Sequence, residues 1–193
     1  MSDWDKFFDK KVKEIAKEKR VLDAGGGAGF QKSLALYKEI FKNCDYQNLD
    51  INPKLAPKIL GDIHNIPISD DYFDAAFCIS VLEHCSAPQK AVYEIYRVLK
   101  PGGKALFYVP FLAPYHGGNY KDYFRFTKDG IEYLFRNFKS AEARPVKMFF
   151  EMWFSLLPNP YSKILSKPLG RAFDKVFRSK GNQVMGYYIF AIK

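Results

Sequence analysis

Residues 21–30, reading Val-Leu-Asp-Ala-Gly-Gly-Gly-Ala-Gly-Phe, decide the fold expected for this chain. Two apolar residues lead into an acid, four glycines follow within five positions, and a segment with helical apolar spacing comes next. That order predicts a strand, a tight glycine loop and a helix. Glycine permits positive φ angles and lets a ligand approach the main chain closely, which is how open α/β sheets bind nucleotides at the carboxyl ends of their strands.

Strands and helices are expected to alternate on both sides of this loop. The apolar run 73–80 is nearly continuous, which is typical of a central parallel strand covered on both faces. Further strands are predicted at 20–24, 46–50, 58–60, 104–109, 141–150 and 187–192, and helices at 3–18, 30–42, 88–99 and 127–138, the last with Thr127 as N-cap. This pattern predicts an α/β, Rossmann-like doubly wound sheet in three layers, with residues 151–180 inserted before the final strand.

Length and cysteine usage limit the class of protein. The chain has 193 residues, which suits a single domain: an N-terminal helix over 1–19, a cofactor-binding core over 20–111 and an acceptor side over 112–193. Its three cysteines, Cys44, Cys78 and Cys85, are an odd number without metal-ligand spacing, so neither a disulfide framework nor a metal site is expected. The charged start lacks the apolar core of a signal peptide, and a cytoplasmic location is expected.

Positive charge is concentrated in the C-terminal part of the chain. Residues 121–193 hold 14 Lys/Arg and 6 Asp/Glu, so this part carries +8 of the formal net charge of +9. A basic surface of this kind suits nucleic acid, anionic lipid or an acidic substrate, or serves only solubility.

The glycine spacing distinguishes between two kinds of nucleotide-like ligand. Gly25, Gly27 and Gly29 form Gly-x-Gly-x-Gly, whereas a dinucleotide fingerprint is Gly-x-Gly-x-x-Gly and would place its third glycine where Phe30 stands. The pattern therefore argues against a dehydrogenase and favours a ligand without a pyrophosphate. S-adenosylmethionine is such a ligand, and Asp23 before the loop suits its ammonium group.

Two acids at later strand ends suit the remaining polar groups of that ligand. Asp50, followed by Ile51, ends the second predicted strand, where an acid can accept hydrogen bonds from both ribose hydroxyls. Asp62 and Ile63 follow the third strand, where the carboxylate suits the adenine amino group and the isoleucine suits the face of the ring. A solvent-facing acid before a turn is the alternative at both places.

Five motifs in order resemble the class I S-adenosylmethionine-dependent methyltransferases, and more narrowly the group related to ubiquinone and menaquinone biosynthesis methyltransferases. The resemblance covers about residues 20–111. Its motifs are Val-Leu-Asp-Ala-Gly-Gly-Gly-Ala-Gly (21–29), Asn-Leu-Asp (48–50), Gly-Asp-Ile (61–63), Phe-Asp-Ala-Ala-Phe-Cys-Ile-Ser-Val-Leu-Glu-His (73–84) and Arg-Val-Leu-Lys-Pro-Gly-Gly (97–103). The resemblance implies a seven-stranded sheet with an antiparallel last strand. It also implies that Ser80, Val81 and the nearby Glu83 and His84 border the methyl donor.

The acceptor side carries weaker signals. Methyl transfer needs a base only if the acceptor must lose a proton, and His116, His84 and Asp122, with Glu83, are the candidates for that role. The stretch Asp-Tyr-Phe-Arg-Phe-Thr (122–127) resembles one found in many bacterial members of the group. Residues expected to contact the acceptor are Glu83, Tyr115, Tyr123 and Arg125. The alternative is that Asp122 and Arg125 pair with each other and brace the loop.

The sequence therefore predicts methyl transfer to a small-molecule acceptor, either lipid-like or a saccharide intermediate. RNA or protein methylation and non-catalytic cofactor binding are the alternatives. Nucleic acid is not expected as a partner, because Ser80-Val81-Leu82-Glu83 stands where base N-methylating enzymes carry Asn/Asp-Pro-Pro-Tyr. Residues 148–165 are apolar, aromatic and flanked by cations, which is typical of peripheral membrane contact, of a lid over an apolar acceptor, or of core.

Overall fold

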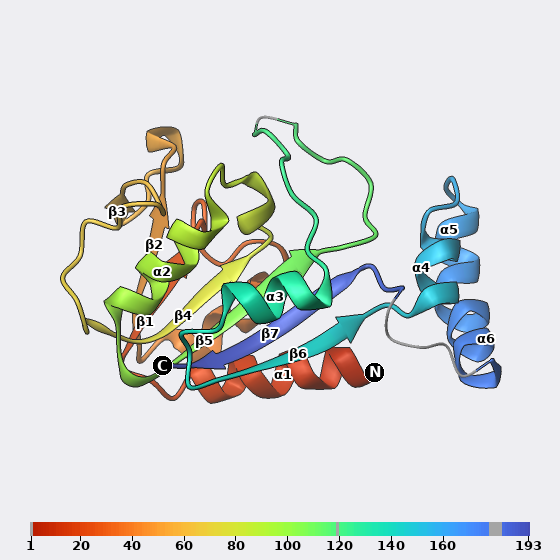
Figure 1. Cartoon of the computed structure of the whole chain (residues 1–193), viewed down its shortest axis with the longest axis horizontal. Helices are drawn as coiled ribbons and strands as arrows, with labels where there is room; N and C mark the ends of the chain where they lie inside the picture. Colours follow the sequence, from red (N-terminus) through yellow and green to blue (C-terminus); the bar gives the residue numbers. More distant parts are fainter. Residues whose placement is uncertain (1, 119, 178–182) are drawn as a thin grey trace.

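A computed structural model describes residues 2–118, 120–177 and 183–193. It contains a seven-stranded sheet in the order β3-β2-β1-β4-β5-β7-β6 (Figure 1). The strands are β1 (Arg20–Ala24), β2 (Asp45–Asp50), β3 (Ile59–Leu60), β4 (Phe73–Ile79), β5 (Leu99–Pro110), β6 (Ser140–Val146) and β7 (Gly186–Ile192). Strands β1 to β5 pair in parallel, and β7 runs antiparallel to both of its neighbours, β5 and β6. The predicted mostly parallel sheet with an antiparallel last strand is confirmed.

Helical elements cover both faces of the sheet. On one face lie α1 (Asp3–Ile15) and the 3-10 helix η1 (Lys32–Phe41), and on the other lie α2 (Pro88–Val98) and α3 (Lys128–Leu134). The shorter 3-10 helices η2 (Pro53–Leu55) and η3 (Leu82–His84) stand in the connections that follow β2 and β4. Thr127 caps α3, since its hydroxyl accepts from the backbone N–H of Gly130 at 3.1 Å.

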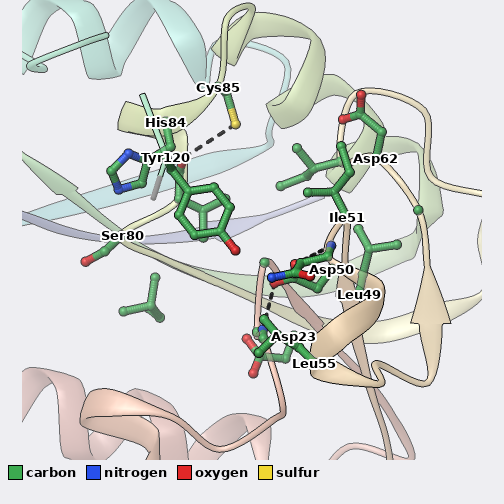
Figure 2. Close-up of a pocket in the computed structure, with 18 of the residues that line it drawn as sticks. Asp23, Leu49, Asp50, Ile51, Leu55, Asp62, Ser80, His84, Cys85 and Tyr120 are labelled. Atoms are coloured by element: carbon green, nitrogen blue, oxygen red, sulfur yellow. Dashed lines mark hydrogen bonds between the residues drawn. The ribbon is translucent and has the colours of Figure 1, made fainter. Parts of the chain in front are cut away.

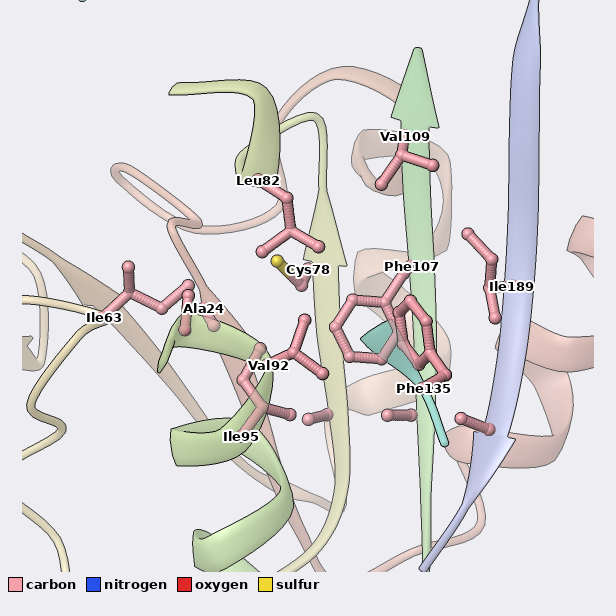
Figure 3. Packing of buried hydrophobic residues seen from close by; sticks show 14 of the residues in the cluster. Ala24, Ile63, Cys78, Leu82, Val92, Ile95, Phe107, Val109, Phe135 and Ile189 are labelled. Atoms are coloured by element: carbon pink, nitrogen blue, oxygen red, sulfur yellow. The ribbon is translucent and has the colours of Figure 1, made fainter. Parts of the chain in front are cut away.

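The central position of strand β4 explains why most of its sequence is apolar. Ala75 and Phe77 pack in the cluster beneath α1 and η1, while Ala76 and Cys78 pack in the cluster beneath α2 and α3. All four are fully buried. Figure 3 shows the second cluster, with Phe107 of β5 at its centre. Because successive side chains of a strand point to opposite faces, a strand buried on both faces is apolar on both; the exception, Asp74 near the start of β4, is half-buried and pairs with Lys100.

Several boundaries differ from expectation. The strand predicted at 141–150 ends at Val146, with helix from Phe149 on, and the helix predicted at 127–138 ends at Leu134. The segment after the glycine loop is a 3-10 helix, in which residues three apart lie on one side. Leu34 is therefore buried and Tyr37 packs partly on the same cluster, whereas Leu36 is 93% exposed. At the end of this helix Phe41 is buried, and Ile40 is exposed although it lies three residues after Tyr37. Strand β5 begins at Leu99 rather than at residue 104, with an irregularity in its pairing where β4 passes Phe73.

The insertion before β7 is helical. It comprises α4 (Phe149–Ser155), α5 (Tyr161–Leu165), a π-helical turn η4 (Ser166–Gly170) and α6 (Arg171–Val176). These helices lie beyond the carboxyl end of β6 at one edge of the molecule, far from β2 and β3 (Figure 1). Among the described residues, none of the helices is both long and apolar enough to cross a membrane.

Candidate cofactor and acceptor site

A cavity of about 580 Å³ opens at the carboxyl ends of β1, β2 and β4. This is the edge of an α/β sheet at which ligands bind, and the volume lies within the usual range for a small-molecule site. Its lining comes from the glycine loop, the ends of three strands, η2, η3 and the loop after β5 (Figure 2). Of the residues expected to bind a cofactor, nine line it: Asp23, Gly25, Gly27, Asp50, Ile51, Asp62, Ile63, Ser80 and Val81.

The glycine loop passes the end of β4 too closely for any side chain at its first position. Gly25 has φ +75°, and a Cβ built there would lie 2.5 Å from Cγ2 of Val81. Gly27 has φ +56°, and a Cβ there would lie 2.9 Å from the amide of Gln31. Position 25 therefore requires glycine for conformation and for space, whereas position 27 requires it for conformation, because the end of the Gln31 side chain can move aside. The main chain forms the cavity wall at both positions.

Strand β2 holds the glycine loop in place. Oδ2 of Asp50 accepts from the backbone N–H of Gly27 at 3.0 Å, and Nδ2 of Asn48 donates to the carbonyl of Gly27 at 2.6 Å. Oδ1 of Asp50 accepts from the N–H of Asn52 at 2.9 Å. Each carboxylate oxygen has a second lone pair, so Asp50 keeps acceptor capacity at the cavity wall (Figure 2).

Asp23 lies at the base of the cavity and is almost fully buried. The hydroxyl of Tyr46 donates to its Oδ2. Burial raises the pKa of Asp23 to about 6, and the negative charge of Asp50 adds to this effect, while the hydrogen bond from Tyr46 opposes it. A cationic group bound beside Asp23 would stabilise its carboxylate.

The opposite end of the cavity is formed by Asp62, Ile63 and His64. Oδ1 of Asp62 accepts from both the backbone N–H and Nδ1 of His64, at 2.8 Å and 2.6 Å. Its other oxygen has no such partner among the described residues and belongs to a half-exposed side chain at the cavity mouth. The apolar side chain of Ile63 follows Asp62 in the lining. Together they suit a ring whose face packs on Ile63 and whose polar edge donates to Asp62.

The turn after β4 has unusual backbone geometry. Ser80 has φ +55°, a conformation that residues other than glycine seldom adopt. This turn directs Ser80 and Val81 to the cavity and leads into η3, which carries Glu83 and His84. Strained backbone at the end of a strand that borders a cavity often marks a functional site.

Glu83, His84 and His116 meet next to the cavity, although only His84 lines it. The side chain of Glu83 is fully buried, and its Oε1 lies 3.3 Å from Nε2 of His116. Burial raises the pKa of Glu83. His116 comes from the loop after β5, so the candidate base and the candidate acceptor-binding acid are neighbours.

Asp122 and Arg125 brace that loop. The guanidinium of Arg125 donates to both oxygens of Asp122 and to the carbonyls of Ala113, Pro114 and Phe124, which uses all five of its N–H groups. Arg125 holds the pKa of Asp122 well below its usual range, so this carboxylate is a poor base. The structure therefore favours the bracing role of both residues over the catalytic and acceptor-binding roles.

Three further candidates also lie outside the cavity lining. Gly29 and Phe30 turn away from it, because Phe30 stacks on the ring of Tyr46 with centroids 3.9 Å apart. Tyr115 is 76% exposed. Tyr123 does line the cavity, as expected.

The cavity contains residues that the sequence analysis missed. Tyr120 points its phenol into the cavity from the loop after β5 (Figure 2). Gln31, Leu49, Asn52, Leu55, His64 and Cys85 also contribute to the lining. Leu49 and Asn52 flank the predicted Asp50 and so could have been found by proximity, whereas no local pattern marks Tyr120 or Cys85.

Comparison with known proteins agrees with this geometry. Residues 22–107 match the family model described as a methyltransferase domain. Over 103 residues the chain is 34% identical to the chloroplastic 2-methyl-6-phytyl-1,4-hydroquinone methyltransferase of Arabidopsis thaliana, covering 47% of this chain and 30% of that protein. It is 29% identical over 196 residues to the uncharacterized protein MJ0638 of Methanocaldococcus jannaschii, covering 87% of this chain and 77% of that protein.

The fold is also found among solved structures. A crystal structure of a SAM-dependent methyltransferase from Archaeoglobus fulgidus aligns with a TM-score of 0.65 and 14% identity, over 96% of this chain and 91% of that one. The chain thus spans less than a third of the Arabidopsis relative but nearly all of this structural neighbour. Residues 22–107 therefore resemble a methyltransferase domain, and the chain has the fold seen in the solved SAM-dependent methyltransferase.

Proposed function

We propose that the chain binds S-adenosylmethionine in this cavity and transfers its methyl group to a small-molecule acceptor. The proposal rests on the position of Asp50 at the end of β2. Its carboxylate accepts from the N–H of Gly27 and keeps free lone pairs at the cavity wall. A carboxylate in that place suits a ribose diol beside a glycine loop that leaves no room for side chains. The methyltransferase domain match and the solved SAM-dependent neighbour support the same ligand.

In this proposal the other cavity residues contact different parts of the ligand. Asp62 and Ile63 hold the adenine, Asp23 receives the ammonium group, and Ser80 and Val81 face the sulfonium. The sulfonium is already a good leaving group, so alignment of acceptor, methyl carbon and sulfur supplies much of the rate. Because Asp122 is paired, Glu83, His84 and His116 remain the candidate bases.

We propose a lipid-like acceptor met at a membrane surface. Exposed apolar side chains gather on the helical insertion at Trp153, Leu156, Leu157, Tyr161, Ile164, Leu169, Phe173, Val176 and Phe177. The Arabidopsis relative, named for a phytyl hydroquinone, supports a prenylated acceptor.

The charges of the insertion favour an anionic surface. Residues 147–177 contain five Lys/Arg and two acids. Both acids are engaged within the insertion, since Glu151 pairs with Arg171 at 3.1 Å and Asp174 accepts from the N–H of Phe150 at 2.9 Å. Arg171 is held by that pair, whereas Lys167 and Lys175 are exposed and remain for lipid headgroups around an apolar and aromatic surface.

Ligand binding and methyl transfer are tested separately. S-adenosylhomocysteine should raise the melting temperature while NAD does not, and equal shifts from both would refute the cofactor assignment. Labelled S-adenosylmethionine should then transfer its methyl group into a lipid extract rather than into RNA or protein. Cofactor binding without transfer to any fraction would favour a non-catalytic binding protein.

Membrane contact has its own readout, because the chain has only two tryptophans, Trp4 and Trp153. Trp153 is 55% exposed on α4. In a Trp4→Phe variant, its fluorescence should shift to the blue with anionic vesicles and less so with zwitterionic vesicles or at high salt. An unchanged spectrum with anionic vesicles would contradict the membrane proposal and leave the cofactor proposal untouched.

A further inference from the structure

We propose that Glu83, His84 and His116 bind a divalent transition-metal ion at the edge of the cavity. Each residue offers a ligand atom, and these atoms lie within 4.8 Å of one another. Glu83 and His84 are adjacent on η3, and His116 approaches them from the loop after β5. Two of the three histidines of the chain thus meet beside one buried carboxylate.

The protons of both imidazoles are directed away from the cluster. Nδ1 of His84 lies 2.8 Å from the carbonyl oxygen of Lys121, and Nδ1 of His116 lies 3.1 Å from that of Pro114. A carbonyl oxygen only accepts, which favours a proton on Nδ1 in each neutral ring and leaves the lone pair of Nε2 for an ion. Metal-ligating histidines characteristically donate their other N–H to a backbone carbonyl in this way.

Glu83 supplies the second, independent observation. Its side chain is fully buried, and Oε2 has no hydrogen-bond partner among the described residues. Its other oxygen faces Nε2 of His116 at 3.3 Å, so with a neutral ring two lone pairs oppose each other. The N–H groups of Arg125, a cation on the same loop, are all engaged by Asp122 and backbone carbonyls. A buried carboxylate oxygen without a partner, as Oε2 is, is costly, and an ion among the three ligand atoms removes that cost.

Two imidazoles and one carboxylate suit a site that keeps a coordination position open. Zn²⁺ in such sites lies about 2.0–2.2 Å from its ligands and holds a water or a substrate oxygen as the fourth. The ligand atoms must therefore draw closer by roughly 1 Å, which rotation of the two rings can provide, because His116 is 43% exposed at its side chain. His84 lines the cavity, so the open position faces it. If the proposed function holds, that position takes an oxygen of the methyl acceptor.

Titration of the metal-free protein with Co²⁺ tests the site. The wild type should bind one Co²⁺ per chain, with visible absorption bands that Zn²⁺ abolishes by competition. His84→Ala, His116→Ala and the isosteric Glu83→Gln should each weaken binding by at least about tenfold. The matched control is His64→Ala, which removes the remaining histidine, at the other end of the cavity, and should leave Co²⁺ binding unchanged.

Several outcomes would overturn the proposal. These are the absence of Co²⁺ absorption in the wild type, equal loss in His64→Ala, or full binding in Glu83→Gln and both other histidine variants. A thiolate-to-cobalt band that disappears in Cys85→Ser would assign the ion to the cavity thiol instead. Circular dichroism establishes that each variant is folded before it is titrated.

S-adenosylhomocysteine binding to the same metal-free samples separates this proposal from the proposed function. The ion site does not include Asp50 or the glycine loop, so the metal-free wild type should still be stabilised by S-adenosylhomocysteine. Co²⁺ binding without that stabilisation would refute the cofactor assignment alone. Stabilisation without Co²⁺ binding would refute the metal site alone.

Discussion

Gly25→Ala should damage both stability and cofactor binding. The new Cβ would lie 2.5 Å from Cγ2 and 2.8 Å from Cγ1 of Val81, far inside the roughly 3.5–4.0 Å of a normal carbon contact. Relieving that overlap costs about 1–3 kcal/mol, and holding an alanine at φ +75° costs about 1–2 kcal/mol more. The expected loss of unfolding free energy is therefore about 2–5 kcal/mol.

Two further variants separate these causes. Gly102 has φ +78° but no atom within 4 Å of a built Cβ, so Gly102→Ala measures the backbone cost alone and should leave cofactor affinity unchanged. Adding Val81→Ala to Gly25→Ala removes both methyl groups that the new Cβ meets, and should recover about 1–3 kcal/mol relative to additivity.

Urea denaturation measures the stabilities, and calorimetric titration with S-adenosylhomocysteine measures the affinities. Gly25→Ala should bind at least about tenfold more weakly, because the loop must shift from the ligand. A Gly25→Ala variant as stable and as tight-binding as Gly102→Ala would refute the argument that the loop is packed against Val81. Stability losses of Gly25→Ala and Val81→Ala that simply add up in the double variant would refute the same argument.

Three other substitutions test the supports of the cavity. Asp50→Ala should weaken S-adenosylhomocysteine binding more than about tenfold, because it removes charge-assisted hydrogen bonds; unchanged affinity by calorimetry would exclude the ribose role. Burial raises the pKa of Asp23 to about 6, above the unfolded value near 3.9, so its stabilisation is complete below about pH 4 and is lost as pH rises through about 6. The stability of the wild type relative to Asp23→Asn should thus fall by up to ~3 kcal/mol from pH 4 to 7, and parallel urea-denaturation curves would contradict this. Arg97 donates all five N–H groups, to Glu94, Asp70 and the carbonyls of two loop residues. Arg97→Ala should therefore lower the free energy of unfolding by about 3 kcal/mol, whereas the exposed Arg136→Ala should lower it by less than about 0.5 kcal/mol. Similar losses for the two variants in thermal unfolding would show that the hydrogen bonds of Arg97 do not stabilise the fold.

The fold could be predicted because its local signals agree with its tertiary contacts. The apolar run of β4 is buried on both faces, and Thr127 caps the helix that it precedes. Where a local pattern competes with geometry, prediction fails. The segment after the glycine loop has apolar residues at α-helical positions, but it forms a 3-10 helix that leaves Leu36 in solvent.

The cofactor side of the cavity was predictable for a related reason. Asp23 and Asp50 lie at the carboxyl ends of β1 and β2, Asp62 follows β3, and the carboxyl ends of parallel strands meet at one edge of the sheet. The acceptor side is built by a loop without regular structure. The sequence offered the pairing of Arg125 with Asp122 only as one of two alternatives, and nothing in it indicates that His116 reaches Glu83.

The most direct measurement of the central claim is a crystal structure of the chain with S-adenosylhomocysteine. The ribose hydroxyls should lie within hydrogen-bonding distance of Asp50, the adenine beside Asp62 and Ile63, and the sulfur opposite Ser80 and Val81. A nucleoside bound elsewhere, or an empty cavity at saturating ligand, would contradict the assignment of this cavity to the methyl donor.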